Sequence, residues 1–143
     1  MEEKDTNDLD RMLENAYPED LEQYITAPIK LHEYFMKYLG SHNFQLNEIV
    51  KKSCIPSNYA YGILNGNRTN PSRDRVIALC LACHMDIIHT NRALKLAGLS
   101  PLYSKNGKDA AIIIMINREI YDLYTINEFL YEHNLPLLIT SKI

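Results

Sequence analysis

A cysteine pair followed by a histidine is the first feature of this 143-residue sequence that could carry chemistry. Cys80-Leu81-Ala82-Cys83-His84 has the C-x-x-C-H spacing of covalent haem attachment. The same spacing also places both cysteines on one face of a helix, among apolar residues. Cysteines in such surroundings usually act as small buried hydrophobic side chains. We prefer that interpretation to a haem site or to a metal site using His84 or His89, and we expect no cofactor.

The remaining polar side chains do not form a pattern typical of an enzyme. The five histidines lack metalloprotease-type spacing, and the sequence has no G-x-S-x-G motif, no phosphate-binding glycine loop and no paired carboxylates. Ten tyrosines could stack on single-stranded nucleic acid, but spacings such as Tyr34/Tyr38 and Tyr121/Tyr124 fit partly buried helix faces better. We therefore expect a binding protein without a metal, rather than an enzyme.

The charge distribution indicates where a partner would bind. The net charge is −3, yet residues 29–107 carry ten basic and four acidic groups, whereas residues 1–28 carry two basic and nine acidic groups. Residues 108–143 are mildly acidic. A basic segment between acidic ones suits contact with phosphates, although surface charge also fluctuates along any chain.

Composition and patterning predict an all-α protein. Glycine and proline are few, at five and six residues, and no segment alternates strictly between polar and apolar positions. The longest apolar run, residues 110–116, is far shorter than the roughly 20 residues of a membrane span. The first ten residues are acidic, unlike a signal peptide. We expect a cytoplasmic protein whose three cysteines are reduced thiols.

The apolar positions predict three parts of the chain. An acidic helical arm (residues 1–28) precedes a central domain (29–99) and a C-terminal helical extension (100–143) that packs on the domain or dimerises. Beyond the arm, helices are expected at residues 29–41, 45–53, 57–65, 91–97, 108–119 and 125–133, with another after Ser72. A strand is the alternative for residues 110–116. The predicted helix-start signals are Ser57, Ser72, Thr90 and a Thr125/Glu128 capping box, and Gly98 is the predicted exit of the fifth helix.

The stretch from Phe44 to Gly66 organises the central domain. It reads as two short helices joined by a tight turn, and an Asn-Gly pair closes the second helix. Ile49, Val50 and Ile63 are among the residues expected to face inwards. The pattern is that of a helix-turn-helix, which indicates a binding module with DNA as its ligand.

Residues 30–99 resemble the Cro/phage-repressor-like (XRE-type) family. The resemblance rests on this helix-turn-helix followed by Asn65-Gly66-Asn67-Arg68 and then Pro71-Ser72. The segment that begins at Ala97-Gly98-Leu99 is similar to a C-terminal extension of some uncharacterised bacterial regulators. The resemblance implies a five-helix, lambda-repressor-like domain whose third helix, residues 57–65, enters the major groove of double-stranded DNA.

The resemblance also implies the residues that contact DNA. Those expected to read base edges are Ser57, Asn58, Tyr59, Tyr61 and Gly62. Asn58 is the strongest candidate, because a carboxamide can form two hydrogen bonds with adenine. Those expected to contact phosphates, which set register rather than sequence choice, are Gln45, Lys51, Asn65, Arg68, Thr69, Asn70 and Arg73.

The sequence departs from the family pattern at three places. Cys54 stands where the turn commonly has glycine, and Gly62 removes a side chain from the recognition helix. An arginine–glutamate pair found in many phage repressors is replaced, by register, with Leu39 and Leu64, an exchange that is often neutral or stabilising.

Two functions follow from these patterns. The leading prediction is a transcriptional regulator that acts as a homodimer on a roughly palindromic site. Its predicted dimer contacts are apolar residues of the last two helices: Ile112, Ile113, Ile116, Phe129 and Leu130. The alternative is a protein-interaction adaptor, or an antitoxin-like partner, that keeps the fold with little base reading and uses the C-terminal helices or the acidic arm. A third variant has the arm cover the basic face.

Overall fold

The computed structural model describes residues 29–138, so the predicted acidic arm of residues 1–28 lies outside it. Within the described range the chain is all-helical, without strands, as predicted, and the apolar run at residues 110–116 is a helix rather than a strand. The helices are α3 (Leu31–Ser41), α4 (Leu46–Lys52), α5 (Ser57–Asn65), α6 (Arg73–Ala82), α7 (Ile87–Leu96), α8 (Gly107–Asn117) and α9 (Leu123–Glu132).

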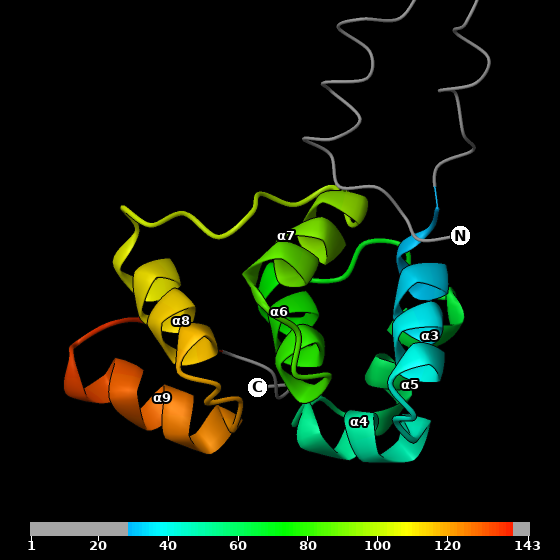
Figure 1. Cartoon of the computed structure of the whole chain (residues 1–143), viewed down its shortest axis with the longest axis horizontal. Helices are drawn as coiled ribbons and strands as arrows, with labels where there is room; N and C mark the ends of the chain where they lie inside the picture. The colour runs from blue at the N-terminus through cyan, green and yellow to red at the C-terminus, as the bar shows by residue number, and fades with distance from the viewer. Residues whose placement is uncertain (1–28, 139–143) are drawn as a thin grey trace, which may run out of the picture.

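Helix α6 lies at the centre of the described structure. Every residue from Val76 to Ala82 is buried, which explains why this helix has no polar face. It contacts α4 and α7, while α8 contacts α7 and pairs with α9. Figure 1 shows α3, α4 and α5 on one side of α6, and α8 with α9 beyond it on the other side.

One hydrophobic core joins these helices. It runs from Phe35 and Ile49 through α6 to Ile112 and Leu130, all of which are fully buried. Of the five predicted dimer residues, Ile112, Ile116 and Leu130 face the protein's own interior, so these three have no apolar surface to spare. Ile113 and Phe129 are only partly buried. Among residues 29–138, no helix has the length and apolar character needed to cross a membrane.

Four of the helices begin with a side-chain cap. Ser72 Oγ accepts a hydrogen bond from the N–H of Arg75, as predicted for the start of α6. The other three caps are the acceptors Asp86 at α7, Asn106 at α8 and Asp122 at α9.

Three predicted helix caps are wrong, although the helix predicted at residues 57–65 matches α5. Thr90 lies buried within α7, which Asp86 starts one turn earlier. Thr125 does not cap α9, because its N–H and hydroxyl both donate to the Asp122 carboxylate. Ser57 is the first residue of α5 rather than its cap, and the preceding residue is Pro56, which has no side-chain acceptor. For α7 and α9 a better-placed acceptor, Asp86 or Asp122, lies just upstream.

Five helices end in the same way, through a left-handed residue followed by an apolar one. The N–H of the apolar residue donates to a carbonyl five positions back, as Leu135 does to Leu130 at 2.9 Å and Met85 does to Cys80 at 3.0 Å. The left-handed residues are Asn43, His84, Gly98, Glu119 and Asn134. Only Gly98 was predicted, because the other four carry side chains.

Two ion pairs fasten α8 to the start of α6. The Arg73 guanidinium forms two hydrogen bonds with the Asp109 carboxylate, at 2.9 and 2.8 Å, and also donates to the carbonyls of Ser100 and Pro101. Lys108 Nζ donates to the Asp74 carboxylate at 2.9 and 3.0 Å. Two neighbouring residues of α6, Arg73 and Asp74, thus pair with two neighbouring residues of α8, Asp109 and Lys108 respectively.

Candidate nucleic-acid interface

The turn between α4 and α5 is held by its own backbone and by one buried serine. Ser53 is fully buried; its hydroxyl donates to the carbonyl of Val50 at 2.7 Å and accepts the N–H of Ile55 at 3.3 Å. Cys54, which follows it, has a φ of 58° and is therefore left-handed. The position that the family pattern gives to glycine thus needs a left-handed residue here too.

Both ends of α5 are fixed by backbone conformation. Pro56 precedes the helix, and Gly66 ends it at a φ of 86°. A Cβ atom on Gly66 would lie only 2.7 Å from Nδ1 of His32 on α3. Glycine is thus required at this exit for both its left-handed conformation and the close approach of α3.

An exposed polar row runs along α5 and contains three of the five predicted base-reading residues. Ser57, Asn58 and Tyr61 are exposed, and Asn65 continues the row one turn later. Tyr61 has 37% of its surface exposed. The side-chain oxygen of Asn58 accepts the N–H of Tyr59 at 2.9 Å. To pair with adenine in the two-bonded manner, this carboxamide would have to turn away from its own backbone.

Tyr59 and Gly62, the other two predicted base-reading residues, lie apart from this row. The Tyr59 ring is half-buried, with the guanidinium carbons of Arg68 and Arg75 each 3.9 Å from its centroid. Gly62 is buried, and a Cβ atom there would lie 2.9 Å from Cγ of Arg68. Arg75 was not singled out from the sequence, because nothing in the local pattern shows that α6 brings it to α5.

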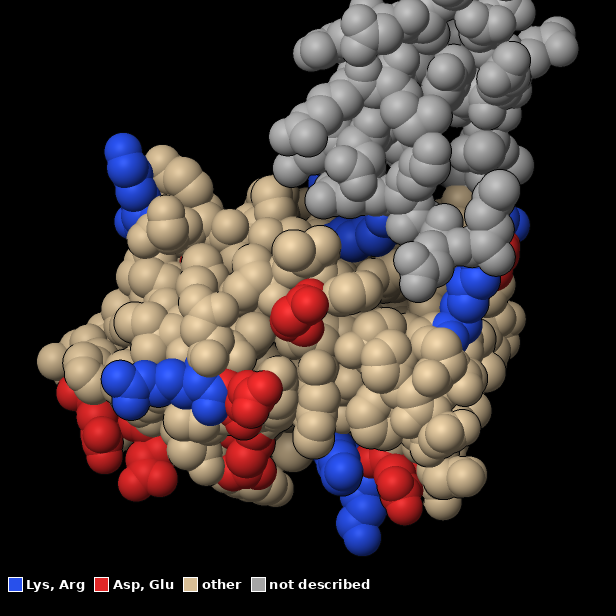
Figure 2. All heavy atoms as spheres, in the orientation of Figure 1, with Lys and Arg blue, Asp and Glu red and all other residues tan. Residues whose placement is uncertain are grey.

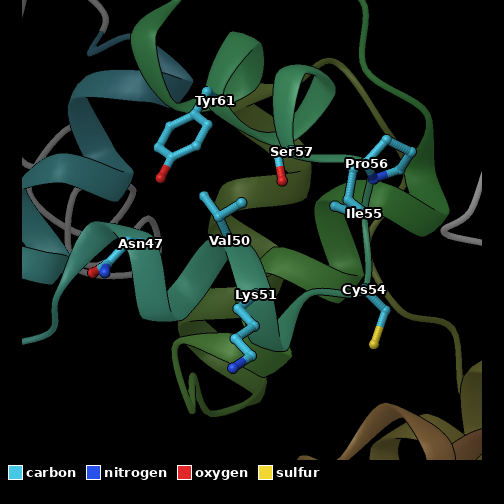
Figure 3. Close-up of a pocket in the computed structure, with 8 residues that line it drawn as sticks. All are labelled: Asn47, Val50, Lys51, Cys54, Ile55, Pro56, Ser57 and Tyr61. Atoms are coloured by element: carbon cyan, nitrogen blue, oxygen red, sulfur yellow. The ribbon is translucent and has the colours of Figure 1, made fainter.

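An open hollow of about 570 Å³ separates α4 from the exposed row. Figure 3 shows Val50 and Lys51 reaching it from α4, and Ser57 and Tyr61 reaching it from α5, with Ile55 and Pro56 at the turn. Lys51 is exposed at its edge, as predicted for a phosphate-contacting residue. The hollow has an apolar floor and a polar rim, which is the kind of surface that can meet a base edge or a thymine methyl group.

Six of the seven predicted phosphate-contacting residues are exposed, and the seventh, Arg73, is bound to other parts of the protein. The exposed set is Gln45, Lys51, Asn65, Arg68, Thr69 and Asn70. Asn65 also stabilises the exit of α5, since its side-chain oxygen accepts the N–H of Asn67 at 2.9 Å. Arg73 is different: its guanidinium is already bound to Asp109 and to the carbonyls of Ser100 and Pro101, so we do not retain it as a phosphate contact.

The surface over α9 differs in charge from the surface at the α4–α5 turn. Figure 2 shows acidic side chains gathered over α9, at the lower left of the view. Asp122, Glu128 and Glu132 are exposed there, as are Tyr124 and Tyr131, at 77% and 74%. This acidic end would repel a nucleic acid backbone, which favours the α4–α5 side as the interface.

The cysteines and histidines show no metal-binding arrangement among the residues that the structure describes. Cys80 and Cys83 are fully buried free thiols, and burial raises the pKa of Cys83 to about 12. His84 instead stacks on the Tyr121 ring with centroids 4.5 Å apart. Burial, and then the charge of Lys52, lower the pKa of His84. Both observations fit structural roles for these side chains.

Comparison with known proteins adds no relative. A scan against protein-family models, a search of curated proteins and a search of solved structures all find no match to this chain.

Proposed function

We propose that this protein is a DNA-binding transcriptional regulator of the XRE type, with α5 as its recognition helix in the major groove. The observation that carries the proposal is the exposed polar row of Ser57, Asn58, Tyr61 and Asn65 on a helix whose two ends are locked. Arg68 and Lys51 lie on either side of that row and supply cations for the phosphates. Base contacts from the row and phosphate contacts beside it are the two parts that sequence-specific binding needs.

The proposal assigns helices α3 to α7 to a lambda-repressor-like domain and places the protein in the bacterial cytoplasm. One such module covers too little DNA for strong discrimination, so we propose a homodimer on two half-sites. The dimer contact cannot use Ile112, Ile116 or Leu130, which are buried within one chain.

The first test is a salt series on random-sequence duplex DNA with the full chain. When lysine and arginine side chains displace counterions from DNA, the logarithm of the binding constant falls with the logarithm of the salt concentration, with a slope of about −0.9 for each phosphate neutralised. We expect a steep negative slope. A slope near zero would remove DNA binding as the function.

The second test distinguishes a residue that contacts phosphates from a residue that recognises a base. Arg68→Ala is expected to weaken binding of all sequences alike and to make the salt slope shallower by about one. Asn58→Ala is expected to lose discrimination at one base pair, by about 1–3 kcal/mol, on a site selected by the wild-type protein. Lys105→Ala, an exposed lysine in the segment before α8, is the matched control. If Asn58→Ala leaves discrimination intact, α5 does not read bases through Asn58.

A second candidate function rests on the tyrosines. Tyr61 at the hollow and Tyr124 and Tyr131 on α9 are exposed, and tyrosine is enriched at protein interfaces. In that case the protein is an adaptor, or an antitoxin-like partner. The salt series distinguishes the two functions, since an adaptor of this kind needs no affinity for random duplex DNA.

A further inference from the structure

A second hollow, the α3–α7 hollow, has a volume of about 420 Å³ and lies between the start of α3, the segment that follows α5 and the end of α7. Figure 1 shows the start of α3 and the end of α7 on the same side of the molecule. The floor of the hollow is apolar, with Leu31 from α3, Ile63 from α5 and Leu96 from α7 among the residues that line it. Leu31 and Leu96 keep part of their surface exposed. An occupant with apolar side chains would remove that surface from water.

The rim of the α3–α7 hollow is basic. Lys30, His32 and Arg68 line it, and none of the described residues that line it is acidic. Lys30 and Arg68 are exposed, and His32 is half-buried. The Arg68 guanidinium lies over the Tyr59 ring at 3.9 Å, a contact that leaves its N–H groups able to bond with an anion. The hollow therefore suits an acidic partner that also carries apolar side chains.

The sequence directly before the hollow has this composition. Residues 1–28 carry nine acidic and two basic groups, and the apolar Leu9, Met12 and Leu13 lie among the acidic residues. This segment joins the described structure at Ile29, which itself lines the hollow. Contact between the two is therefore intramolecular, with an effective concentration on the order of millimolar. The negative charge of the segment is opposite to the basic balance of residues 29–107, which favours association.

We propose that residues 1–28 dock in the α3–α7 hollow and compete with DNA for Arg68. Carboxylates of the segment pair with Lys30 and Arg68 at the rim, and its apolar side chains cover Leu31 and Leu96. Arg68 and Thr69, which both line the hollow, are also phosphate contacts of the proposed DNA interface. The docked segment therefore covers part of that interface. The docking stands on the hollow and the charges, whereas the competition rests on the proposed function.

The first experiment measures docking in the full chain without DNA. Diethylpyrocarbonate modifies histidine rings at a rate set by their access to solvent, and mass spectrometry gives the rate at His32. The triple variant Asp8→Asn, Asp10→Asn, Glu14→Gln removes three negative charges from the segment. It is expected to raise the rate at His32 by about threefold, the increase that follows if the segment covers His32 in about two of every three molecules. The rate at the exposed His42 should not change.

Two control variants are matched to this experiment. The first removes three exposed negative charges at and near α9, by Glu119→Gln, Glu128→Gln and Glu132→Gln, and should leave the rate at His32 unchanged. The second concerns the hollow itself. Lys30→Gln is expected to raise the rate at His32, whereas Lys37→Gln, at an exposed lysine of α3 that does not line the hollow, should leave it unchanged.

The second experiment measures binding of the full chain to random-sequence duplex DNA at one salt concentration. The segment variant is expected to gain about threefold more affinity than the α9 control variant does. This comparison is needed because any loss of negative charge strengthens the attraction to DNA. Unfolding curves for each variant establish that it folds.

Four outcomes separate the docking, the competition and the proposed function. If the segment variant leaves the rate at His32 unchanged, the docking is wrong and the proposed function stands. If the rate in the wild type falls as protein concentration rises, the occupant belongs to a second copy, and docking within one chain is wrong. If the rate rises but the segment variant gains no more DNA affinity than the α9 control, the competition for Arg68 is wrong. If the rate rises and the wild type shows no salt-dependent DNA binding, the proposed function fails and the docking stands.

Discussion

Cys54 is one of the residues that carry a side chain in the left-handed backbone region. A residue with a Cβ in the left-handed region pays a steric penalty that glycine avoids and that asparagine lessens. Cys54 has a φ of 58° between α4 and α5, and its side chain is only partly buried. Little packing is therefore available to offset the strain.

Cys54→Gly is expected to raise the free energy of unfolding by about 0.5–1 kcal/mol, because relief of the left-handed strain exceeds the entropy cost of glycine. Asn43→Gly, at a left-handed φ of 58° at the end of α3, is the matched control and should change stability by a few tenths of a kcal/mol at most. Urea unfolding of both variants measures the difference. Equal effects at the two sites would show that the residue type contributes nothing to the strain.

Sequence reasoning at the residue scale succeeds where the cause is local. The inward-facing Ile49, Val50 and Ile63 follow from helical spacing, and all three are buried. The roles of Tyr59 and Gly62 could not be predicted in this way. They depend on Arg75, which α6 brings from 16 positions away in the chain from Tyr59, and spacing within α5 carries no information about that approach.

At the scale of elements, the junction of α6 and α8 depends on a charged pair that is largely out of water. The side chain of Asp109 is 6% exposed and that of Arg73 is 26% exposed. Burial alone would raise the pKa of Asp109, but hydrogen bonds from Arg73 and from the Tyr103 N–H outweigh it and lower the pKa. The ionised form is therefore the one that holds α8 in place.

Removing one partner of this pair is expected to destabilise the protein. Asp109→Asn should lower the free energy of unfolding at pH 7 by about 2–3 kcal/mol, less than for a fully buried pair because Arg73 keeps some contact with water. Lys108→Met, which breaks the more exposed pair with Asp74, should cost about 1 kcal/mol or less.

The effect of Asp109→Asn is expected to depend on pH. The folded-state pKa of Asp109 is depressed, so its contribution is fully present above the unfolded value of about 3.9 and is lost as pH falls through the folded value. Urea unfolding of both proteins at pH 7 and in steps from about pH 4 down to about pH 2 measures this, and the two stabilities should approach each other as the pH falls below the unfolded value. A constant difference across that range would mean that the charge of Asp109 is not what holds the junction.

Helix identity was easier to predict than helix ends. Seven helices follow from apolar spacing, yet α7 and α9 both begin earlier than predicted, since Asp86 and Asp122 cap them upstream of the threonines that were chosen. Several acceptable cap residues lie near each start, and local sequence does not rank them. The left-handed exits at His84 and Glu119 were missed because neither is the glycine or asparagine that usually ends a helix in this way.

At the scale of the whole molecule, the described helices share one core. Phe35 in α3, Leu79 in α6 and Leu130 in α9 belong to a single buried cluster. We expect one cooperative unfolding transition for residues 29–138, since no helix pair has a separate core.

The expected transition can be followed by two signals. Far-UV circular dichroism reports all the helices, and tyrosine emission reports local packing, because the chain has ten tyrosines and no tryptophan. Their urea midpoints should coincide. Two separated transitions would show that the helices do not unfold as one cooperative unit, contrary to this prediction.

The fixed ends of α5 affect how the exposed side chains of this helix could change during evolution. Pro56 and the left-handed Gly66 define the start, length and rotation of this helix through backbone geometry. The exposed Ser57 and Tyr61 contribute little to that geometry, whereas Asn65 also holds the exit of the helix through the N–H of Asn67. Under the proposed function, side chains at these exposed positions can therefore change one at a time, and binding preference with them, without a new demand on the folding of α5.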